Sequence, residues 1–455
     1  MSADLVIRNA LLVSPEASRH GAVAVSQGRI VAIGRSDAMP SARRVIDAGG
    51  RPLIPGALDV HVHVRDPGFT YKETWATATA AAAVGGVTTI FDMPNTNPPT
   101  ATAEALRDKI AIAASQTHVD FGVYGYVGER NIGELAAMAQ AGACGFKLLL
   151  GSDNRLVPAP NDGAVLEALA QIAQTGLRCT VHAENNAILR WREAKIRAQG
   201  RDDLSAHLDH HTDVAAVEAI QRVILLAEWT GAKIHIAHEN CRHALPLIAA
   251  AKRRGIDITA ETCPHYLFLS VADAACATGG NALRVKPPVR DPSHAGPLWE
   301  ALLDGTLDIL STDHAPHTVE EKNRASVWET APGFSGVEIS MRLMLTQVAA
   351  GRLSLERYVA VACAAPARAF GLWPRKGSLQ LGADADMVLL DLDHRAPIRG
   401  ADFKSLGKVT PFEGVETIGR AGSTFLRGEL IAHHGEIVSP MGRGRSASIK
   451  TVEPD

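Results

Sequence analysis

The chain carries the stretch Asp59-Val60-His61-Val62-His63-Val64-Arg65-Asp66-Pro67-Gly68, which follows a Pro/Gly turn and an apolar run. Its β-branched residues favour a short strand that ends before the Pro-Gly pair. Side chains on a strand repeat every two residues, so His61 and His63 project to the same side. Two imidazoles on one face at a strand end suit a metal site, although an isolated His-x-His pair also fits two ordinary core histidines.

Beyond this stretch the sequence alternates between helical patterns, glycines and apolar strand-like runs. Helical patterns that stop at a glycine are each followed by such a run, as at Gly85-Gly86, Gly142, Gly176, Gly231, Gly255 and Gly305. Glycine supplies the left-handed residue that ends a helix, and alternating helices and apolar strands indicate an α/β fold with a parallel sheet. This many consecutive units predicts a (β/α)₈ TIM-type barrel, with an open doubly wound sheet as the alternative.

The two ends of the chain show a different pattern. Residues 4–50 read as short strands joined by hairpin-like turns, and the far end reads the same way, for example at residues 423–431. Segments of this kind on both sides of one long α/β region can fold together. We therefore expect a small β-sandwich domain formed by residues 1–53 and 378–455, and a metal-binding barrel formed by residues 54–377.

The bulk composition limits the classes of function. The 455 residues are 46% hydrophobic, and the net charge is −3 with acidic and basic residues interleaved, which argues against a nucleic-acid partner. The first residues lack the features of a signal peptide, and no apolar run is long enough to cross a bilayer. Scattered cysteines without a Cys-x-x-Cys pair favour reduced thiols, so we expect a cytoplasmic protein. The cysteines are Cys144, Cys179, Cys241, Cys263, Cys276 and Cys363.

Chemistry-bearing residues collect where the predicted strands end. In a (β/α)₈ barrel the active site lies at the carboxyl ends of the strands. Applied to this chain, the rule selects His61, His63, Lys147, His182, His238 and Asp313. Imidazole and carboxylate groups are the ligands of zinc and similar divalent ions. Any single histidine would more often be a core residue, but the set together predicts a metal centre at the mouth of the barrel.

Lys147 stands inside the apolar run Phe146-Lys147-Leu148-Leu149-Leu150. A lysine can reach solvent from such a position, but burial would disfavour its ammonium form and lower its pKa. A neutral amine can capture CO₂ to form a carbamate, which is an anionic ligand able to bridge two metal ions. Two such ions about 3.5–4 Å apart activate a water molecule and polarise a carbonyl group.

Six motifs carry a family resemblance. They are His61-Val62-His63, Gly145-Phe146-Lys147, His182-Ala183-Glu184-Asn185, His235-Ile236-Ala237-His238, Pro287-Pro288-Val289-Arg290 and Asp313-His314-Ala315-Pro316-His317. Over nearly its whole length the chain resembles cyclic amidohydrolases of the dihydroorotase, allantoinase and hydantoinase group. The resemblance implies two divalent ions, expected to be Zn²⁺, and a carbamate on Lys147. His61, His63, Lys147 and Asp313 would hold one ion, and Lys147, His182 and His238 would hold the other.

The resemblance also implies a reaction, the opening of a small cyclic amide. Asp313 would take the proton of the attacking hydroxide and deliver it to the departing amide nitrogen. The surroundings of Arg65 and Asn95 resemble dihydroorotases, in which Arg65, Asn95 and His317 would bind the substrate carboxylate. We therefore expect a dihydroorotase that interconverts (S)-dihydroorotate and N-carbamoyl-L-aspartate in pyrimidine biosynthesis.

Other features favour an allantoinase or a hydantoinase/dihydropyrimidinase that uses the same pair of metals. Thr262-Cys263-Pro264-His265-Tyr266 resembles allantoinases, and residues 377–382 resemble hydantoinases. Lys286 stands where a dihydroorotase usually has asparagine. A third alternative is a non-catalytic relative that acts as an assembly partner, but such proteins typically lack metal ligands that this chain retains. The family also implies a homo-oligomer.

One group of histidines lies outside this set. His207, His210 and His211 occur in a polar segment that precedes a predicted helix. Charged and polar neighbours are typical of a solvated surface, so we expect these three side chains to be exposed and without a role.

Overall fold

Two β-sheets organise the residues that the computed structural model describes, which are 2–152, 154–275 and 280–447. Cys276 lies outside the described residues. The first sheet has eight parallel strands in chain order. They are β6 (Ala57–Val62), β7 (Val87–Asp92), β8 (Asp120–Val127), β9 (Gly145–Leu149), β10 (Cys179–His182), β11 (Ile234–Ile236), β12 (Ile258–Thr262) and β13 (Ile309–Leu310).

The first and last of these strands meet and nearly close the sheet into a barrel. Val62 forms a parallel bridge with His314, and the His63 N–H donates to the His314 carbonyl oxygen at 2.8 Å. The predicted (β/α)₈ barrel is confirmed, and the open doubly wound sheet is excluded. Closure also brings the carboxyl end of β6 beside the segment that follows β13, where Asp313 lies.

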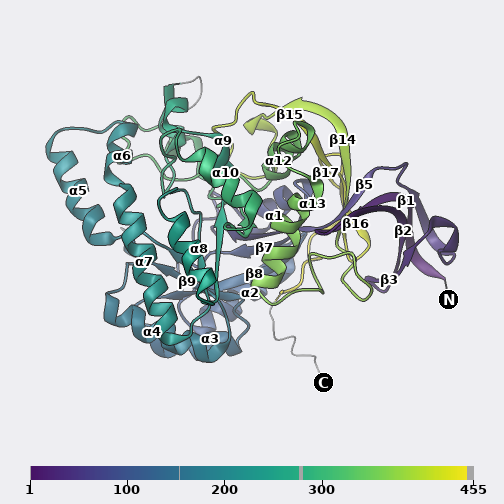
Figure 1. Cartoon of the computed structure of the whole chain (residues 1–455), viewed down its shortest axis with the longest axis horizontal. Coiled ribbons are helices and arrows are strands. Elements are labelled where there is room, and N and C mark those ends of the chain that lie inside the picture. The colour runs from purple at the N-terminus through teal and green to yellow at the C-terminus, as the bar shows by residue number, and fades with distance from the viewer. Residues whose placement is uncertain (1, 153, 276–279, 448–455) are drawn as a thin grey trace.

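Helices surround this barrel and connect its strands (Figure 1). The larger ones are α1 (Trp75–Val84), α2 (Ala103–Gln116), α3 (Leu135–Gln140), α4 (Asp162–Thr175), α5 (Asn186–Ala198), α6 (Leu204–His210), α7 (Asp213–Thr230), α8 (Leu245–Arg253), α10 (Ala295–Asp304) and α12 (Ser340–Ala349). The short helices are α9 (Pro264–Phe268), α11 (Val319–Lys322), α13 (Leu355–Val359) and α14 (Ala365–Ala369). As predicted, Gly176 and Gly231 end α4 and α7 with φ near 73°, a conformation that costs glycine nothing.

The second sheet is built from both ends of the chain. Its strands are β1 (Ala3–Val13), β2 (Ser18–Ser26), β3 (Arg29–Gly34), β4 (Ala42–Asp47), β5 (Pro52–Pro55), β14 (Met387–Pro397), β15 (Glu416–Leu426), β16 (Glu429–His433) and β17 (Glu436–Ile437). In Figure 1 the purple N-terminal strands and the yellow-green C-terminal strands lie together on one flank of the barrel. The expected β domain from both termini is confirmed.

Strand β5 joins the two halves of this second sheet. It pairs in parallel with β1 and antiparallel with β14, so the predicted boundary after residue 53 falls inside the strand. Residues 443–447 return to the barrel, where the Ala447 N–H donates to the Phe121 carbonyl oxygen at 2.7 Å. The limits of the two domains remain a prediction. Because β5 belongs to the second sheet, we propose that the boundary between this sheet and the barrel lies after β5.

Strand β8 was not among the strands expected from the sequence, because it contains Gly122 and Gly125. Glycine weakens a strand pattern unless a neighbour approaches closely. A Cβ atom at Gly122 would lie 2.7 Å from Phe91 Cδ1 and 2.8 Å from Cys144 Cβ. The close packing of β8 against its neighbouring strands therefore explains both glycines.

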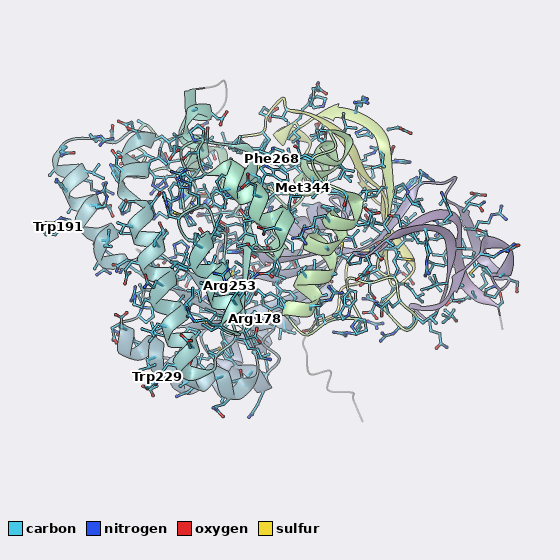
Figure 2. All side chains as sticks on the ribbon, in the orientation of Figure 1. Arg178, Trp191, Trp229, Arg253, Phe268 and Met344 are labelled. Carbon is cyan, nitrogen blue, oxygen red and sulfur yellow. The ribbon has the colours of Figure 1, made fainter. Side chains whose placement is uncertain are left out.

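None of the helices in the described ranges is long and apolar enough to cross a membrane. Two tryptophans nevertheless lie on the outer surface, Trp191 on α5 and Trp229 on α7, and both are labelled at the rim of the molecule in Figure 2. Their exposed fractions are 78% and 82%. Large apolar side chains in such positions often mark a surface that contacts another protein.

A buried charge cluster fastens the barrel to the second sheet. Lys376 Nζ lies 2.5 Å from Asp120 Oδ2 at the start of β8, 2.5 Å from Asp386 Oδ2 and 3.0 Å from Asp384 Oδ2. Burial alone would lower the pKa of Lys376, but the three aspartates outweigh it and raise that pKa. Because the folded-state pKa is the higher one, this stabilisation is complete at neutral pH and is lost only as the pH rises through it.

We expect Lys376→Met to lower the free energy of unfolding at pH 7 by about 3–5 kcal/mol, because it removes the cation shared by all three buried aspartates. Arg427 still pairs with Asp120 and Arg29 with Asp384, but Asp386 loses its ion pair. Urea denaturation measures this change. The control is Lys404→Met, which removes a partly exposed pair with Glu436 and should change stability by about 1 kcal/mol or less. Equal effects of the two substitutions would contradict the role of Lys376.

Candidate metal centre and active site

A cavity of about 530 Å³ opens at the carboxyl ends of the barrel strands. Every site residue expected from the sequence lines this cavity, including both the expected metal ligands and the expected substrate residues. These residues are His61, His63, Arg65, Asn95, Lys147, His182, His238, Asp313 and His317. Lys286 lines the cavity as well. Side chains from distant parts of the chain therefore converge at the predicted end of the barrel.

His61, His63 and Asp313 form one half of the cluster. The Nε2 atoms of His61 and His63 lie 3.3 and 3.2 Å from Asp313 Oδ1. Asp59 holds β6 and the Asp313 segment in register, since its carboxylate accepts from the backbone N–H groups of His61 and Thr312, each at 3.2 Å. Two imidazole nitrogens and a carboxylate oxygen that face one another in this way form a ligand set suited to zinc.

Hydrogen bonds on the outer side orient the two rings. His61 Nδ1 lies 2.5 Å from Glu261 Oε1, and His63 Nδ1 lies 2.9 Å from Asn95 Oδ1. If each Nδ1 carries the proton, each Nε2 presents a lone pair to the cavity, as a metal-bound histidine requires. Burial, followed by the charge of Lys147, lowers the pKa of His61 to about 4, so this ring is neutral near pH 7.

His182 and His238 form the other half. His182 Nε2 bonds to Glu184 Oε2 at 2.9 Å, and His182 Nδ1 lies 2.9 Å from His238 Nε2. The bond to Glu184 leaves a lone pair on His182 Nδ1, directed at the same point as His238 Nε2. Burial, with a smaller contribution from the neighbouring His182, holds the pKa of His238 well below its usual value. These two nitrogens provide a second set of donors.

Lys147 is near members of both halves, because it contacts His61 and its charge also helps to lower the pKa of His238. Its side chain is 2% exposed, and Nζ is 3.5 Å from His61 Nε2. Burial lowers the pKa of Lys147 to about 8, which increases the fraction of neutral amine that could react with CO₂. The donor sets on both sides of a buried amine fit two divalent ions joined by a carbamate on Lys147.

The backbone is strained at three residues of this cavity. Arg65, His238 and Asp313 have φ angles of 68°, 40° and 45°, in the left-handed region that non-glycine residues rarely adopt. Strain of this kind costs about 1–3 kcal/mol per residue and persists where the surrounding structure imposes it, often at functional sites. The strained positions therefore support a functional role for this end of the barrel.

The three expected substrate residues do not act alike. Asn95 is bonded to His63, whereas Arg65 Nη2 lies 3.2 Å from His317 Nε2. His317 also bonds to the Pro332 carbonyl oxygen at 3.0 Å. Arg65 Nε is buried and has no hydrogen-bond partner in the described part of the chain. Arg65 is therefore the member of the trio with donor capacity left for a ligand.

One expectation is wrong. His207, His210 and His211 are not exposed, because their exposed fractions are only 0%, 5% and 2%. His210 and His211 line the cavity, and His211 Nδ1 bonds to Glu184 Oε1 at 2.8 Å. The polar neighbours that suggested a solvated surface cover only the outer side of α6.

Sequence reasoning also missed the carboxylates that orient the histidines, namely Asp59, Glu184 and Glu261. Glu261 contacts both His61 and His235, and it is fully buried near the end of β12. The available signal was an acidic residue inside each of three apolar strand-like runs or directly after one. A buried carboxylate needs a partner, so such positions predict a nearby donor.

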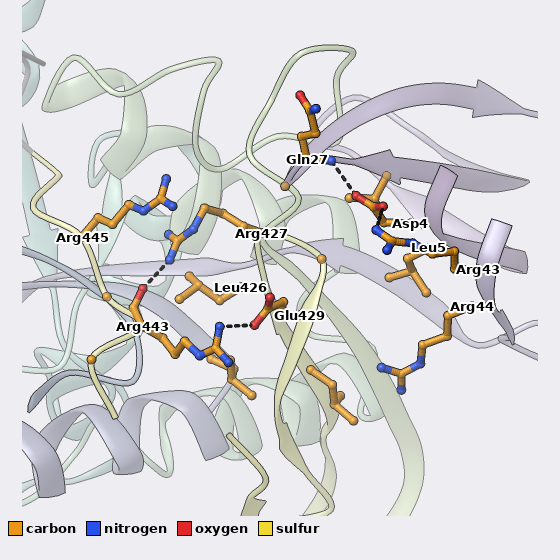
Figure 3. Close-up of a pocket in the computed structure, with 17 residues that line it drawn as sticks. Asp4, Leu5, Gln27, Arg43, Arg44, Leu426, Arg427, Glu429, Arg443 and Arg445 are labelled. Carbon is orange, nitrogen blue, oxygen red and sulfur yellow. Dashed lines mark hydrogen bonds and ion pairs between the residues drawn. The ribbon is translucent and has the colours of Figure 1, made fainter. Parts of the chain in front are cut away.

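A second, larger cavity of about 750 Å³ lies on the terminal sheet, away from the barrel mouth. Figure 3 shows arginines along its wall, of which Arg43 pairs with Asp4 and Arg443 pairs with Glu429 at 2.7 Å. None of the residues that line it is a histidine or a cysteine. Its two carboxylates, Asp4 and Glu429, are each paired with an arginine, and no imidazole accompanies them. The barrel cavity, where several histidines converge, is therefore the candidate active site despite its smaller volume.

Comparison with known proteins gives consistent matches over the whole chain. The model of the amidohydrolase family matches residues 53–431. The L-hydantoinase of Paenarthrobacter aurescens is 37% identical over 99% of both chains, and the allantoinase of Deinococcus radiodurans is 35% identical over 97% of this chain and 98% of its own. The solved L-hydantoinase from Arthrobacter aurescens superposes with a TM-score of 0.95 at 36% identity, over 98% of this chain and 100% of its own.

These matches favour one of the alternatives that the sequence leaves open. The relatives are a hydantoinase and an allantoinase, so the expectation of a dihydroorotase in pyrimidine biosynthesis is less well supported than the hydantoinase or allantoinase alternative. They also argue against a non-catalytic assembly partner.

Proposed function

Because the chain belongs to the amidohydrolase family and is a metal-dependent cyclic amidohydrolase, we propose that its substrate is a hydantoin ring with a substituent at carbon 5. Hydantoin and allantoin share this five-membered ring, and allantoin is its 5-ureido derivative. The observation that carries the proposal is the convergence of His61, His63, His182, His238 and Asp313 around the buried Lys147, on a chain similar from end to end to a hydantoinase and an allantoinase.

The proposed centre holds two divalent ions, with Zn²⁺ as the first candidate. His61, His63 and Asp313 would hold one ion, His182 and His238 the other, and carboxylated Lys147 both. When bound, the ions would supply an activated water and polarise the ring carbonyl. The side chains of the protein perform the remaining tasks. Glu261, Asn95 and Glu184 orient the imidazole rings, and a carboxylate moves a proton.

Asp313 is the proposed proton carrier. Its carboxylate lies at the mouth of the barrel, on a strained residue that closure of β6 against β13 holds in place. In the forward reaction it accepts a proton from the attacking water, and the amide nitrogen receives that proton as the ring opens. One C–O bond forms to the ring carbonyl carbon and one ring C–N bond breaks, so the single product carries both a carboxylate and a carbamoyl-substituted amine, and water is the only co-reactant.

The cavity lining supports a polar substituent on the ring. Beyond the metal ligands it presents charged side chains from several loops together with a few apolar ones. The charged residues include Arg65, Lys72, Arg190, Glu193 and Arg284. Such a wall suits the ureido group of allantoin better than a bare hydrocarbon.

A substrate panel tests the proposal on metal-replete protein. Allantoin, 5-methylhydantoin, dihydrouracil and dihydroorotate are compared by their kcat/KM values, with ring opening followed by loss of ultraviolet absorbance. We expect allantoin to give the highest kcat/KM value of the four compounds. A higher kcat/KM for dihydroorotate would overturn the assignment.

Arg65→Ala separates the two substrate classes. A bidentate guanidinium–carboxylate pair contributes two charge-assisted hydrogen bonds, so turnover of dihydroorotate should fall by about 10²-fold or more if Arg65 binds its carboxylate. A neutral hydantoin ring offers no such partner, so its kcat/KM should fall by about tenfold or less. Arg65→Lys is the control, since it keeps the charge and loses the fork. Loss of both activities to the same extent would show that Arg65 supports the centre itself.

We also propose that the chain forms a homo-oligomer through the outer faces of α5 and α7. Trp191, Leu225 and Trp229 support this, because all three are large, apolar and more than half exposed. Leu225 and Trp229 are one helical turn apart on α7 and share a face.

The free cysteines that the structure describes are buried, which is consistent with a protein that functions in a reducing compartment. We propose that this compartment is the cytoplasm.

Light scattering coupled to size exclusion tests the oligomer. We expect the wild-type mass to be a multiple of the 48.2 kDa chain, and the double substitution Trp191→Glu and Trp229→Glu to reduce it. Leu381→Glu, at an exposed apolar residue away from these helices, should leave the mass unchanged. A monomeric wild-type protein, or a double variant of unchanged mass, would refute the proposed surface.

A further inference from the structure

Three buried histidines next to the catalytic cavity form a cluster that the proposed function does not use. His207 and His210 lie on α6, and His211 follows its last turn. One ligand nitrogen from each of the three rings lies within 4.8 Å of the other two. We propose that His207, His210 and His211 bind a further divalent transition-metal ion, separate from the pair at the barrel mouth.

One ring nitrogen of His207 is hydrogen-bonded, and the other has no hydrogen-bond partner among the described residues. Its Nε2 atom lies 2.9 Å from the Val285 carbonyl oxygen, to which it donates, whereas its buried Nδ1 has no hydrogen-bond partner among the described residues. Burial holds the pKa of His207 well below its usual value, so the ring is neutral and Nδ1 carries a free lone pair. A neutral imidazole fixed through its outer N–H is the usual form of a metal-binding histidine.

His211 repeats this arrangement with the two nitrogens exchanged. Its Nδ1 bonds to Glu184 Oε1 at 2.8 Å, and its buried Nε2 has no partner in the described ranges. A carboxylate that orients a ligand histidine is a recurrent feature of zinc sites. The rings of His207 and His211 are 4.6 Å apart between centroids, so the two inward nitrogens belong to one small volume.

His210 closes the third side. Its ring centroid is 4.3 Å from that of His211, and the residue lines the catalytic cavity. An ion held here by three imidazoles would have its fourth position directed toward the cavity, where water or a ligand atom could occupy it. Three histidines with an open fourth position suit Zn²⁺, Co²⁺ or Ni²⁺ rather than Mg²⁺ or Ca²⁺, which prefer oxygen ligands.

The spacing fits such an ion after small side-chain shifts. A tetrahedral ion about 2.0–2.1 Å from each nitrogen requires nitrogens about 3.4 Å apart, so the rings must close by about 1 Å or less each. As an ordinary core cluster, the same arrangement would leave two buried nitrogens, His207 Nδ1 and His211 Nε2, without a hydrogen-bond partner among the described residues, which is unfavourable. Metal binding satisfies both at once.

The cluster is linked to the proposed catalytic pair through Glu184. One oxygen of this carboxylate bonds to His211, and the other bonds to His182 at 2.9 Å. His207 touches neither Glu184 nor the cavity wall, which makes it the residue whose replacement isolates the cluster.

Metal content tests the proposal on the full chain. Wild-type protein and a His207→Gln variant are loaded with Zn²⁺, desalted and measured for zinc per chain. We expect the variant to hold one equivalent fewer. The control is His118→Gln, at a buried histidine far from the barrel mouth whose Nδ1 also has no partner in the described chain, and it should hold as much zinc as the wild type.

A second measurement gives a positive signal. In a His207→Cys variant loaded with Co²⁺, a thiolate replaces one imidazole ligand and should produce a sulfur-to-cobalt charge-transfer band. If this variant does not fold, the same band is measured in His210→Cys. Equal zinc content in the wild type and His207→Gln, or folded cysteine variants without the band, would overturn the proposal. The test measures a difference of one zinc equivalent between the wild type and the variant. Its result therefore does not depend on whether the proposed catalytic pair of ions is correct.

Discussion

Replacement of Asp313 by asparagine is expected to lower kcat/KM for the best hydantoin substrate by about 10³- to 10⁴-fold. The amide is close in size to the carboxylate but cannot accept a proton at neutral pH. It also removes the negative charge that lies 3.2–3.3 Å from two imidazole nitrogens. Steady-state kinetics on metal-replete variant protein, with zinc content measured in parallel, separate loss of proton transfer from loss of metal.

Asp308→Asn is the matched control for this substitution. Asp308 directly precedes β13, at the opposite end of the strand from Asp313, and it pairs with Lys252 at 2.7 Å. The kcat of this variant should lie within about twofold of the wild-type value, because the effect is specific to the barrel mouth. An Asp313→Asn variant with near-normal kcat would remove Asp313 as the proton carrier.

The second large effect is expected at Lys147. Lys147→Ala should lose both catalytic ions and about 10³-fold or more of the activity, because the proposed bridging ligand disappears and the buried histidines face one another without it. Lys147→Arg keeps a cation in the same place but cannot form the carbamate, so it should be equally inactive. Zinc per chain and kcat/KM measure the two losses.

Chemical rescue makes the Lys147 prediction sharper. Lys147→Ala removes four non-hydrogen atoms beyond Cβ, the same number that acetate contains, so acetate or propionate should restore part of the metal binding and activity. The control is Lys322→Met, at a buried lysine whose Nζ donates to backbone carbonyl oxygens rather than facing the histidines. Full activity in Lys147→Arg would contradict the carbamate.

The barrel could be predicted because its signal is repeated and local. Each helix that ends at a glycine before an apolar run contributes independent support, and Gly176 and Gly231 have the expected left-handed conformation. Strand β8 could not be predicted, because Gly122 is explained only by the neighbouring side chains of Phe91 and Cys144. Such contacts come from tertiary packing and leave no trace in the local pattern.

The residues of the candidate metal centre could be located from the sequence because histidine and lysine are unusual at the ends of apolar strands. Their carboxylate partners are harder to recognise, since Glu261 and Asp59 look like ordinary acidic residues until the strands that carry them become neighbours. The histidines at 207, 210 and 211 illustrate the opposite error. Polar neighbours suggested exposure, whereas packing of α6 against the Val285 segment buries them.

Substrate choice depends on side chains whose role changes with small differences in placement. Arg65, Asn95 and His317 suggested a carboxylate site, but Asn95 is engaged by His63 and His317 is bonded to Arg65 and to a carbonyl oxygen. The motif therefore predicts the location of the substrate better than its identity. Residues from several loops shape the remaining wall, and loops vary most where specificity differs.

Anomalous diffraction from crystals of zinc-loaded protein tests the central claim most directly. The account predicts one zinc peak within about 2.0–2.2 Å of the Nε2 atoms of His61 and His63, and another at the same distance from His182 Nδ1 and His238 Nε2. It also predicts added density on Lys147 Nζ that reaches both peaks. Zinc bound elsewhere with these four rings empty, or an unmodified Lys147 directed away from them, would contradict it.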